Sequence, residues 1–442
     1  MKNNSRRFFL CAAIMLLGLC KTAAQTTQQQ ANTFLNDSII ATGHVGISIY
    51  EPATGKYLYN YNAEKNFIPS SNVKLFSLYA GLKYLGDSLV GAKIFETADS
   101  IFFEPTGDPT LLHKDFKNQP LFDKLSLANK NISLFTKRID HFEKYGAGWA
   151  WDDSNEDFMP ERNRFPIYGN VFTFFKEGGK ILSIPPKSTT SKYMGEMNST
   201  YNGYFKVKRS SFEFDWNIYF TKSDKLFTYQ EIPFPTNRLY HDQILLLADT
   251  LKRDSKKIEW LINADGQFSN LYSRPVDSLF KPMMFNSDNF FAEQTLLMAS
   301  NEKLGYMSDE EMIDTLLKID LKDIPTKPRW VDGSGLSRYN LFSPKDFIYI
   351  LDKLQKEFGL ARMKRILPTA GQGTLRGYYE KDAGFIYAKT GSMTNNVSLS
   401  GYLITKQSKL LLFSIIINNY SGSGRAGRKA IEKFIQGVRL SN

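Results

Sequence analysis

A serine and a lysine three residues apart open the stretch that most constrains this chain. Beyond Pro69-Ser70-Ser71-Asn72-Val73-Lys74, apolar side chains recur at three- and four-residue steps: Leu75, Leu78, Tyr79, Leu82 and Leu85. This periodicity predicts an amphipathic helix. Residues three apart lie on one face of a helix, with β-carbons about 5–6 Å apart. We therefore expect the Lys74 amine to reach the Ser71 hydroxyl.

Such a pair can support nucleophilic catalysis only if the lysine acts as a base. The pKa of Lys74 would have to fall from about 10.4 to near neutral, a change worth roughly 4 kcal/mol. Burial and a second cation are the usual causes of such a shift. Because Ser-x-x-Lys also occurs by chance on solvated helices, the rest of the chain must supply a second cation, a proton shuttle and an anion site.

The N-terminus predicts export. Three basic residues, Lys2, Arg6 and Arg7, precede the apolar run Phe8–Leu19, and small residues follow it. This pattern is typical of a secretory signal peptide, which we expect to cover residues 1–24. The run is too short to span a membrane. We therefore expect a protein of the periplasm or cell envelope, and peripheral membrane association stays open.

Both cysteines, Cys11 and Cys20, lie inside the predicted signal peptide. The exported chain would then hold no thiol, disulfide or cysteine ligand. Lipidation of Cys20 is the alternative, and the large Leu19 before it disfavours that alternative. The four histidines are scattered without ligand spacing, so we predict no metal and no cofactor.

The chain is mildly basic. Its formal net charge is +11, or +7 without the four basic residues of the predicted signal peptide. A positive net charge of this size is compatible with a protein that acts near anionic envelope polymers. It is equally compatible with an ordinary solvated surface. The charge is spread along the sequence, so no nucleic-acid module is expected.

The order of segments predicts an α+β fold with a large insertion. A helix at 31–41 and a hairpin of His44–Tyr50 and Lys56–Tyr61 lead into the Ser71 helix. Residues 97–270, called here the accessory unit, are rich in turns and poor in helical periodicity. Its strand-like segments include Ser100–Phe103, Val171–Phe175, Gly203–Lys208 and Phe212–Phe220.

Helical periodicity returns after the accessory unit. A helix is expected at Ser343–Phe358, followed by strands at Val397–Ile404 and Leu410–Asn418 and a last helix to Leu440. We therefore predict that residues 25–96 and 271–442 form one catalytic domain, interrupted by the accessory unit.

Two further motifs complete a set with the first. Ser71-x-x-Lys74, Ser287-Asp288-Asn289 and Lys389-Thr390-Gly391 follow one another along the chain. Taken singly, the second could be a helix cap and the third a hairpin turn. Together, in this order, they are typical of serine-type penicillin-binding proteins and class A β-lactamases.

Acyl transfer assigns roles to five residues of the three motifs. Ser71 would attack, and Lys74 would take its proton. Lys389 would be the second cation, lowering the pKa of Lys74 and attracting a terminal carboxylate. Ser287 could relay a proton to the departing amine, while Asn289 could hold the amide group of the substrate.

The third motif would bind the end of the substrate. We expect the hydroxyls of Thr390 and Ser392, on either side of Gly391, to hold the terminal carboxylate. The backbone N–H groups of Ser71 and Ser392 would form the oxyanion hole, where loss of one donor typically lowers the rate ~100–1,000-fold.

Other stretches fit one family. Alongside the three motifs stand Gly107-Asp108-Pro109-Thr110-Leu111, Gly148-Trp149-Ala150-Trp151-Asp152-Asp153 and Asp332-Gly333-Ser334-Gly335-Leu336-Ser337-Arg338. With these, the chain resembles the low-molecular-mass class C penicillin-binding proteins, the D-alanyl-D-alanine carboxypeptidase/endopeptidase family, over nearly all its mature length. The acidic pair Asp152-Asp153 is either a structural turn or a substrate contact.

The resemblance implies a β-lactamase/transpeptidase-like serine acyltransferase domain carrying β-rich accessory domains. It also implies removal of the terminal D-alanine from bacterial peptidoglycan stem peptides, often with cleavage of cross-links, and inhibition by β-lactams. The balance between carboxypeptidase and endopeptidase activity stays open, because one constellation serves both.

Two alternatives share this fold. A β-lactamase of class A would carry a Glu-x-x-Leu-Asn segment after the second motif, and none follows Ser287. A non-catalytic wall-binding or β-lactam-sensing module would have no need of an intact nucleophile, base, shuttle and clamp. The run Gly422–Gly427 formally matches a dinucleotide fingerprint, but it lies too near the C-terminus for a second strand, so we interpret it as the start of the last helix.

Overall fold

The computed structural model describes residues 27–136, 140–186, 194–196, 207–209, 218–220, 228–234, 236, 240–255, 258–261 and 266–442. The predicted signal peptide, including Cys20, lies outside these residues. Most of the two strands predicted between residues 203 and 220 also lies outside them. Their described parts are β9 (Val207–Arg209) and β10 (Ile218–Phe220).

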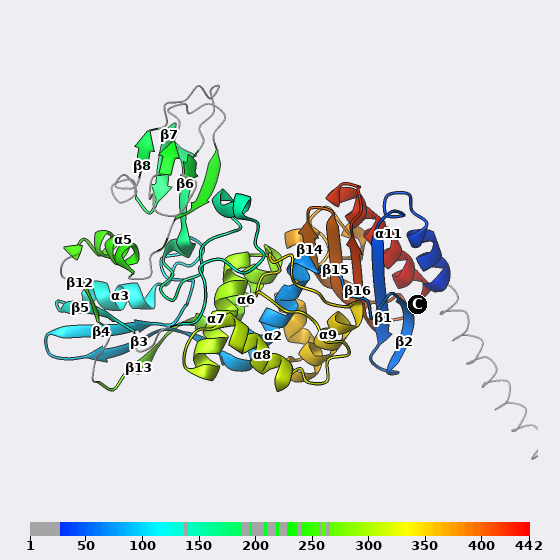
Figure 1. The fold of residues 1–442 in the computed structure, drawn as a ribbon, viewed down its shortest axis with the longest axis horizontal. Coiled ribbons are helices and arrows are strands. Elements are labelled where there is room, and N and C mark those ends of the chain that lie inside the picture. Colours follow the sequence, from blue (N-terminus) through cyan, green and yellow to red (C-terminus); the bar gives the residue numbers. More distant parts are fainter. Residues whose placement is uncertain are drawn as a thin grey trace, which may run out of the picture.

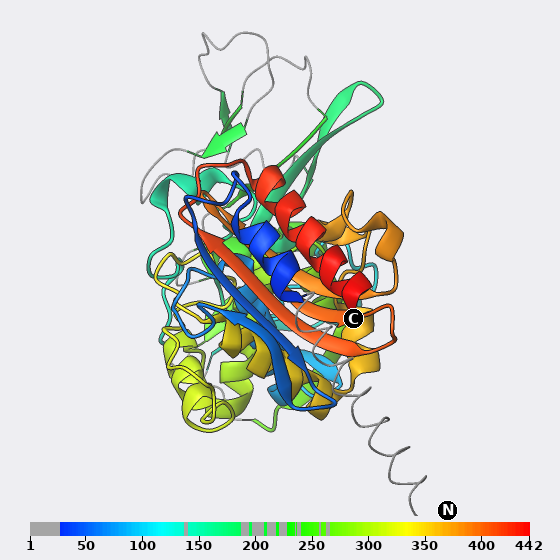
Figure 2. The same ribbon diagram turned by 90° about the vertical axis from the view of Figure 1, so that its right-hand side faces the viewer.

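One antiparallel sheet joins the two ends of the chain. The N-terminal hairpin continues the C-terminal strands in the order β14-β15-β16-β1-β2, with Ile47 opposite Ile415. Helix α11 and a helix at 27–35 cover one face (Figure 2), where Phe34 stacks on Phe434. The elements are β1 (His44–Glu51), β2 (Lys56–Tyr61), β14 (Ile386–Met393), β15 (Asn396–Ile404), β16 (Leu410–Asn418) and α11 (Gly424–Ser441).

The helix at 27–35 lies earlier than the predicted 31–41. After it, the Asp37 carboxylate accepts the N–H of Ile39 at 3.0 Å, which forms an Asx turn. Such a local side-chain bond competes with helical hydrogen bonds and favours a turn. The apolar periodicity of this segment therefore identified residues that pack on the sheet, such as Ile40, but it did not show where the helix ends.

A cluster of helices covers the other face of this sheet and lies between it and a second five-stranded sheet (Figure 1). Its central member is α2 (Lys74–Tyr84), whose residues from Lys74 to Leu82 are all buried. Gly81 permits this packing, because a Cβ there would lie 2.6 Å from Phe280 and from Thr295. The other helices are α6 (Asp277–Phe285), α7 (Asn289–Leu304), α8 (Asp309–Lys318), α9 (Pro344–Phe358) and α10 (Leu360–Ile366).

The predicted amphipathic helix is thus a buried helix. The sequence showed one apolar face, whereas α2 is buried on every face from Lys74 to Leu82 and only its last turn is exposed. Small residues within it, Ser77, Ala80 and Gly81, fill the positions that the periodicity left as a polar face. The polar Lys74 is buried with them, and this burial matters for its chemistry.

The accessory unit contributes β12, β5 and β4 of the second five-stranded sheet, whose order is β12-β5-β4-β3-β13, and two three-stranded sheets. Helices α3 and α5 pack on the second sheet (Figure 1). The described elements are β3 (Ser88–Glu96), β4 (Ser100–Pro105), α3 (Pro120–Leu127), β5 (Asn131–Phe135), β6 (Val171–Glu177), β7 (Lys180–Ile184), β8 (Met194–Glu196), β11 (Tyr229–Pro233), α5 (His241–Leu251), β12 (Ile258–Leu261) and β13 (Ser269–Pro275).

Strands β3 and β13 pair with each other at an edge of the second sheet. The second sheet therefore includes residues on both sides of the range 97–270. The domain limits at 97 and 270 remain a prediction. Within the residues that the structure describes, none of the helices is long and apolar enough to cross a membrane.

Candidate active site

The proposed nucleophile lies on a tight turn at the junction of the first sheet and the helices. Ser71 belongs to a 3-10 turn, η1 (Ser70–Val73), and the α-helix proper begins at Lys74. The predicted contact between the two side chains is nevertheless present: Lys74 Nζ donates a hydrogen bond to Ser71 Oγ at 3.0 Å.

Strand β15 holds this turn in place. Ser398 Oγ donates to the carbonyl of Pro69 at 2.7 Å, and Asn72 Nδ2 donates to Ser400 Oγ at 3.1 Å. Ser398 and Ser400 share one face of the strand. The fully buried Asn72, within the motif, is thus a tether between the helix cluster and the sheet.

Gly335 makes room for the turn from the opposite side. Its φ is +85°, and a Cβ there would lie 2.0 Å from the carbonyl oxygen of Ser70. No shift of a flexible side chain can relieve that clash, since the atom belongs to the backbone. The loop 332–338 can therefore approach the nucleophile only with glycine at this position.

We predict that Gly335→Ala abolishes rapid acylation of Ser71, because the turn must move by more than 1 Å and a displacement of that size costs about 100-fold in rate. The matched control is Gly359→Ala, which has the same φ of +85° and open space around its Cα. Both glycines have a positive φ, so alanine adds backbone strain in both variants. Equal acylation rates in the two variants would contradict this role of Gly335.

Lys74 donates to three acceptors. Besides Ser71 Oγ, they are Asn289 Oδ1 at 2.6 Å and the carbonyl oxygen of Ser334 at 2.7 Å. An ammonium group has three protons, so all three are used. The base is therefore fixed in position among described residues from three separate parts of the chain.

Burial lowers the pKa of Lys74 to about 8, against the opposing charges of Asp332, Asp288 and Glu293. With a pKa near 8, about one tenth of the lysine is neutral at pH 7. From the sequence, we expect a pKa near neutral for this amine. The three carboxylates, which the sequence did not place beside Lys74, hold the pKa above that expectation.

Lys389 is the second buried lysine of the site. Its Nζ donates to Ser287 Oγ at 2.8 Å and to the carbonyl of Thr390 at 2.7 Å. Burial lowers the pKa of Lys389 well below its ordinary value, and the positive charge of Lys74 lowers it further. The two lysines are thus close enough for their charges to interact, because nearby ammonium groups resist being charged together. The effect of Lys389 on the pKa of Lys74 stays a prediction.

The pKa of Lys74 predicts a pH dependence. Only neutral Lys74 can accept the Ser71 proton, so the rate constant of acylation should rise with pH through about 8 and level off above it. Stopped-flow acylation by a chromogenic β-lactam between pH 6 and pH 10 measures this rise of the rate constant with pH, called here the acid limb. An acid limb centred below pH 6 would contradict Lys74 as the base.

Asn289 is the first residue of α7. Its Oδ1 accepts from Lys74, and its Nδ2 donates to the carbonyl of Phe158 at 2.8 Å. Lysine can only donate and a carbonyl can only accept, so these two partners fix which way the amide points. The preceding Asp288 caps α7 by accepting the N–H of Phe291, and burial raises its pKa to about 6.

Strand β14 carries the third motif past the nucleophile turn. At Gly391 a Cβ would lie 2.2 Å from Ser398 Oγ and 2.7 Å from the carbonyl oxygen of Pro69, so only glycine allows this close approach. Thr390 is buried, whereas Ser392 is exposed. The predicted carboxylate clamp thus lies along the turn that holds Ser71.

Arg428 adds a cation that the sequence did not reveal as part of the site. It lies on α11, and its Nη2 donates to Ser392 Oγ at 2.5 Å. Among the described side chains, Arg428 Nε is buried without a hydrogen-bond partner. Arg428 directly follows the glycine-rich run Gly422–Gly427, which we had interpreted only as a helix start.

The loop 332–338 is organised by one carboxylate. Asp332 accepts hydrogen bonds from the N–H groups of Gly335 at 2.9 Å and Ser337 at 2.6 Å, and from Trp149 Nε1 at 2.9 Å. The Trp149 contact links this loop to the accessory unit. The family-like stretches around Trp149 and Asp332 therefore meet in space.

The acidic pair lies nearby on the 3-10 turn η2 (Trp151–Asn155). Burial and the charge of Asp152 raise the pKa of Asp153, and Arg338 opposes that shift. Both readings of the pair, a turn or a substrate contact, fit this placement.

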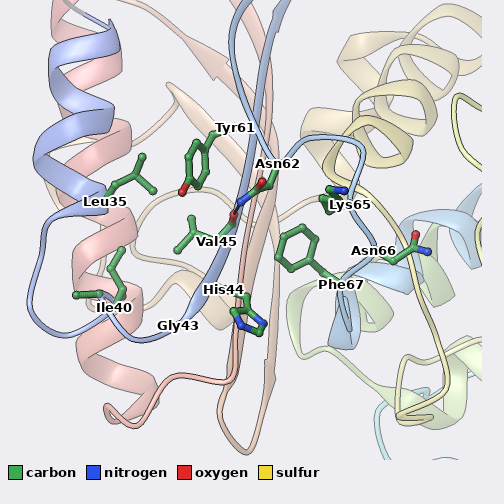
Figure 3. A pocket seen from close by; sticks show the side chains of 11 residues that line it. Leu35, Ile40, Gly43, His44, Val45, Tyr61, Asn62, Lys65, Asn66 and Phe67 are labelled. Carbon is green, nitrogen blue, oxygen red and sulfur yellow. Dashed lines mark hydrogen bonds between the residues drawn. The ribbon is translucent and has the colours of Figure 1, made fainter.

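A separate hollow of about 380 Å³ lies between the 27–35 helix and the β1–β2 hairpin. Figure 3 shows Tyr61, Lys65 and His44 around it. All residues that line this hollow lie between Leu35 and Phe67 in the sequence, and none belongs to the three motifs. The chemistry is therefore placed by the hydrogen bonds of Ser71, Lys74, Ser287, Asn289 and Lys389, and this hollow has no part in it.

A family model covers most of the chain. Residues 27–176 and 248–438 match the model of the D-Ala-D-Ala carboxypeptidase 3 (S13) family. The chain belongs to this S13 family. The predicted family, and with it the predicted class of serine carboxypeptidase, is confirmed.

Curated relatives agree with this membership of the S13 family. The chain is 25% identical to the penicillin-sensitive carboxypeptidase A of Dictyostelium discoideum over 435 residues, 84% of this chain and 82% of the relative. It is 23% identical to the D-alanyl-D-alanine carboxypeptidase DacB of Haemophilus influenzae, over 82% of each chain.

Solved structures confirm the predicted fold. Penicillin-binding protein 4 of Haemophilus influenzae aligns with a TM-score of 0.72 at 18% identity, over 94% of this chain and 98% of that one. The peptidoglycan endopeptidase Bd3459 of Bdellovibrio bacteriovorus aligns with a TM-score of 0.52 at 15% identity, over 90% and 93%. At these identities the likeness concerns the fold alone.

Proposed function

We propose that this S13-family chain is an exported carboxypeptidase that removes the terminal D-alanine from peptidoglycan stem peptides through an acyl-enzyme on Ser71. The observation that carries the proposal is the contact of the buried Lys74 amine with Ser71 Oγ at 3.0 Å. The second buried lysine, Lys389, contacts Ser287 Oγ at 2.8 Å, which supports a proton path on the leaving-group side.

In acylation, Ser71 Oγ attacks the carbonyl carbon of the penultimate D-alanine while its proton passes to neutral Lys74. The negative charge moves to the carbonyl oxygen, which the backbone N–H groups of Ser71 and Ser392 stabilise. Collapse of this intermediate breaks the C–N bond. The departing amine takes a proton through the Ser287 hydroxyl, and water then hydrolyses the ester to return Ser71 to its starting state.

The terminal carboxylate would lie along β14. Thr390 and Ser392 offer hydroxyls beside Gly391, and Arg428 adds a cation that already donates to Ser392. A bound carboxylate favours the charged form of a nearby amine. Substrate binding would therefore raise the pKa of Lys389 from its depressed value, so that Lys389 takes a proton from solvent and passes it through Ser287 to the amine. In deacylation Lys74 would return its proton to Ser71, and the new carboxyl group would leave as a carboxylate, with both protons of the attacking water passing to solvent.

β-Lactams would acylate the same serine, because they present a strained amide beside a carboxylate. In this respect it is relevant that a β-lactam complex of the Haemophilus influenzae penicillin-binding protein 4 is known. The N-terminal pattern of residues 1–24 supports work outside the cytoplasm, at the periplasm or cell envelope.

The test is D-alanine release from a pentapeptide that ends in D-Ala-D-Ala. We expect steady release by the mature chain and only a slow, near-stoichiometric reaction with nitrocefin. Rapid nitrocefin turnover without D-alanine release would favour the β-lactamase, and neither reaction would favour a binding module. Digestion of purified cross-linked muropeptides measures endopeptidase activity on the same preparation.

A further inference from the structure

Two of the three hydrogen-bond acceptors of Lys74, Ser334 and Asn289, are connected to residues of the accessory unit by further hydrogen bonds. The carbonyl of Ser334 accepts from Lys74, and the N–H of the same residue donates to Glu293 Oε1 at 2.7 Å. The other carboxylate oxygen, Glu293 Oε2, accepts from Arg162 Nη1 at 3.3 Å. Arg162 and Glu293 are 2% and 1% exposed. A continuous chain of contacts therefore runs from Arg162 to the base.

The other acceptor, Asn289, is held by Phe158, which lies four residues before Arg162 in the accessory unit. The carbonyl of Phe158 accepts from Asn289 Nδ2 at 2.8 Å, which turns Asn289 Oδ1 toward Lys74 Nζ. Without this carbonyl, the amide could rotate and place its NH₂ group against the ammonium group. The orientation of Asn289 thus depends on a backbone atom of the accessory unit.

We propose that the accessory segment Phe158–Arg162 is a positioning element for the catalytic base, acting on Lys74 through Asn289 and through Glu293 and Ser334. The inference rests on the proposed acylation of Ser71 and adds residues outside the three motifs to it. The accessory unit then takes part in catalysis as well as in the shape of the protein.

The segment is rigid enough for this role. Glu161 accepts from the N–H of Thr236 at 2.7 Å and from Tyr145 OH at 2.9 Å. Arg162 Nε donates to the carbonyl of Glu143 at 2.9 Å, and its Nη1 to Asp309 at 2.5 Å. The side chains of residues 159–162 are buried, whereas that of Phe158 is 40% exposed. The Phe158 carbonyl is held locally by its contact with Asn289 and by the turn in which the Met159 N–H donates to the carbonyl of Glu156 at 3.0 Å.

The charges around Lys74 and Glu293 set the expected pH effect. Lys74 faces Asp288, which caps α7, Glu293 within α7, and Asp332 from the loop 332–338. Lys74 is also close enough to Lys389 on β14 to lower its pKa. Glu293 in turn faces Arg162, Asp309 and Asp332; burial raises its pKa to about 7, and Arg162 opposes that rise. Arg162 therefore favours the ionised form of Glu293.

The test compares two buried arginines, Arg162 at the end of the segment and Arg164 just beyond it. Arg164 lies two residues beyond Arg162 and is 3% exposed, but it binds Asp140 and Asn301, away from the acceptors of Lys74. We expect Arg162→Met to slow acylation by benzylpenicillin by about 10- to 100-fold. Arg164→Met is expected to keep the rate of the unmodified enzyme and to lose only thermal stability.

A second variant, Glu293→Gln, gives a readout that a structural role alone would not move. It keeps an oxygen for the Ser334 N–H but removes a negative charge that raises the pKa of Lys74. The acid limb of the acylation rate should therefore move to lower pH. This variant decides the matter if Arg162→Met does not fold.

Equal acylation rates in the two arginine variants, or an unmoved acid limb in Glu293→Gln, would overturn the inference while leaving the proposed function intact. No acylation of the unmodified enzyme would instead refute the proposed function, and this inference with it. The unmodified enzyme is therefore measured first, in the same assay.

Discussion

Ser71→Ala should abolish D-alanine release from a D-Ala-D-Ala pentapeptide, with a loss on the order of 10⁴-fold or more. Alanine cannot form the ester intermediate, and the other groups of the site cannot replace the nucleophile. The loss should fall on kcat, because the carboxylate clamp on β14 is untouched. Release of D-alanine, followed with a coupled oxidase, measures the effect.

The matched control for this variant is Ser70→Ala. Ser70 directly precedes the nucleophile and is buried, and its Oγ has no hydrogen-bond partner among the described residues. Its φ of +50° is as unfavourable for serine as for alanine. We expect Ser70→Ala to keep activity within a few-fold, and full activity in Ser71→Ala would end the proposed mechanism.

Lys74→Met is expected to lower the acylation rate about 10²- to 10⁴-fold, the range of a lost general base. Methionine fills much of the same buried space without a charge or a donor. The remaining reaction should lose the acid limb near pH 8, because the group that titrates there is gone. The rate constant of acylation by a chromogenic β-lactam, measured across pH, tests both statements.

The control for Lys74→Met is Lys83→Met on the same helix. Lys83 is half-exposed at the far end of α2 and pairs with Glu357 at the surface, so its loss should leave acylation unchanged. A rate for Lys74→Met within a few-fold of the unmodified enzyme would move the base role elsewhere. A retained acid limb near pH 8 would do the same.

The parts of the site that could be predicted are those in which residue type and spacing carry the signal. Ser71 and Lys74 had to share a face whether the turn is a 3-10 turn or an α-helix. The hairpin strand Lys56–Tyr61 was predicted with the bounds that β2 has. Local pattern also gave β16 at Leu410–Asn418.

The parts that could not be predicted depend on contacts between distant segments. Arg162 and Glu293 are 131 positions apart, and neither belongs to a motif. Phe158 acts through a backbone carbonyl, which every residue possesses, so no residue type could reveal it. Sequence alone also could not show that three carboxylates surround Lys74.

The extent of the burial around Lys74 could not be predicted for a related reason. From the sequence we named burial and a second cation as causes of a lowered pKa, and burial is the largest cause in the structure. Burial of α2 on every face from Lys74 to Leu82 is a property of the assembled fold. A one-faced apolar pattern could not reveal it.

The central claim, that Ser71 forms the acyl-enzyme, is tested most directly by mass spectrometry of the mature chain after incubation with benzylpenicillin. We predict one covalent adduct of the mass of the intact drug, located by proteolysis on the peptide that contains Ser71. The Ser71→Ala variant should carry none. An adduct on a different residue, or an unmodified Ser71 peptide beside a modified protein, would contradict the account.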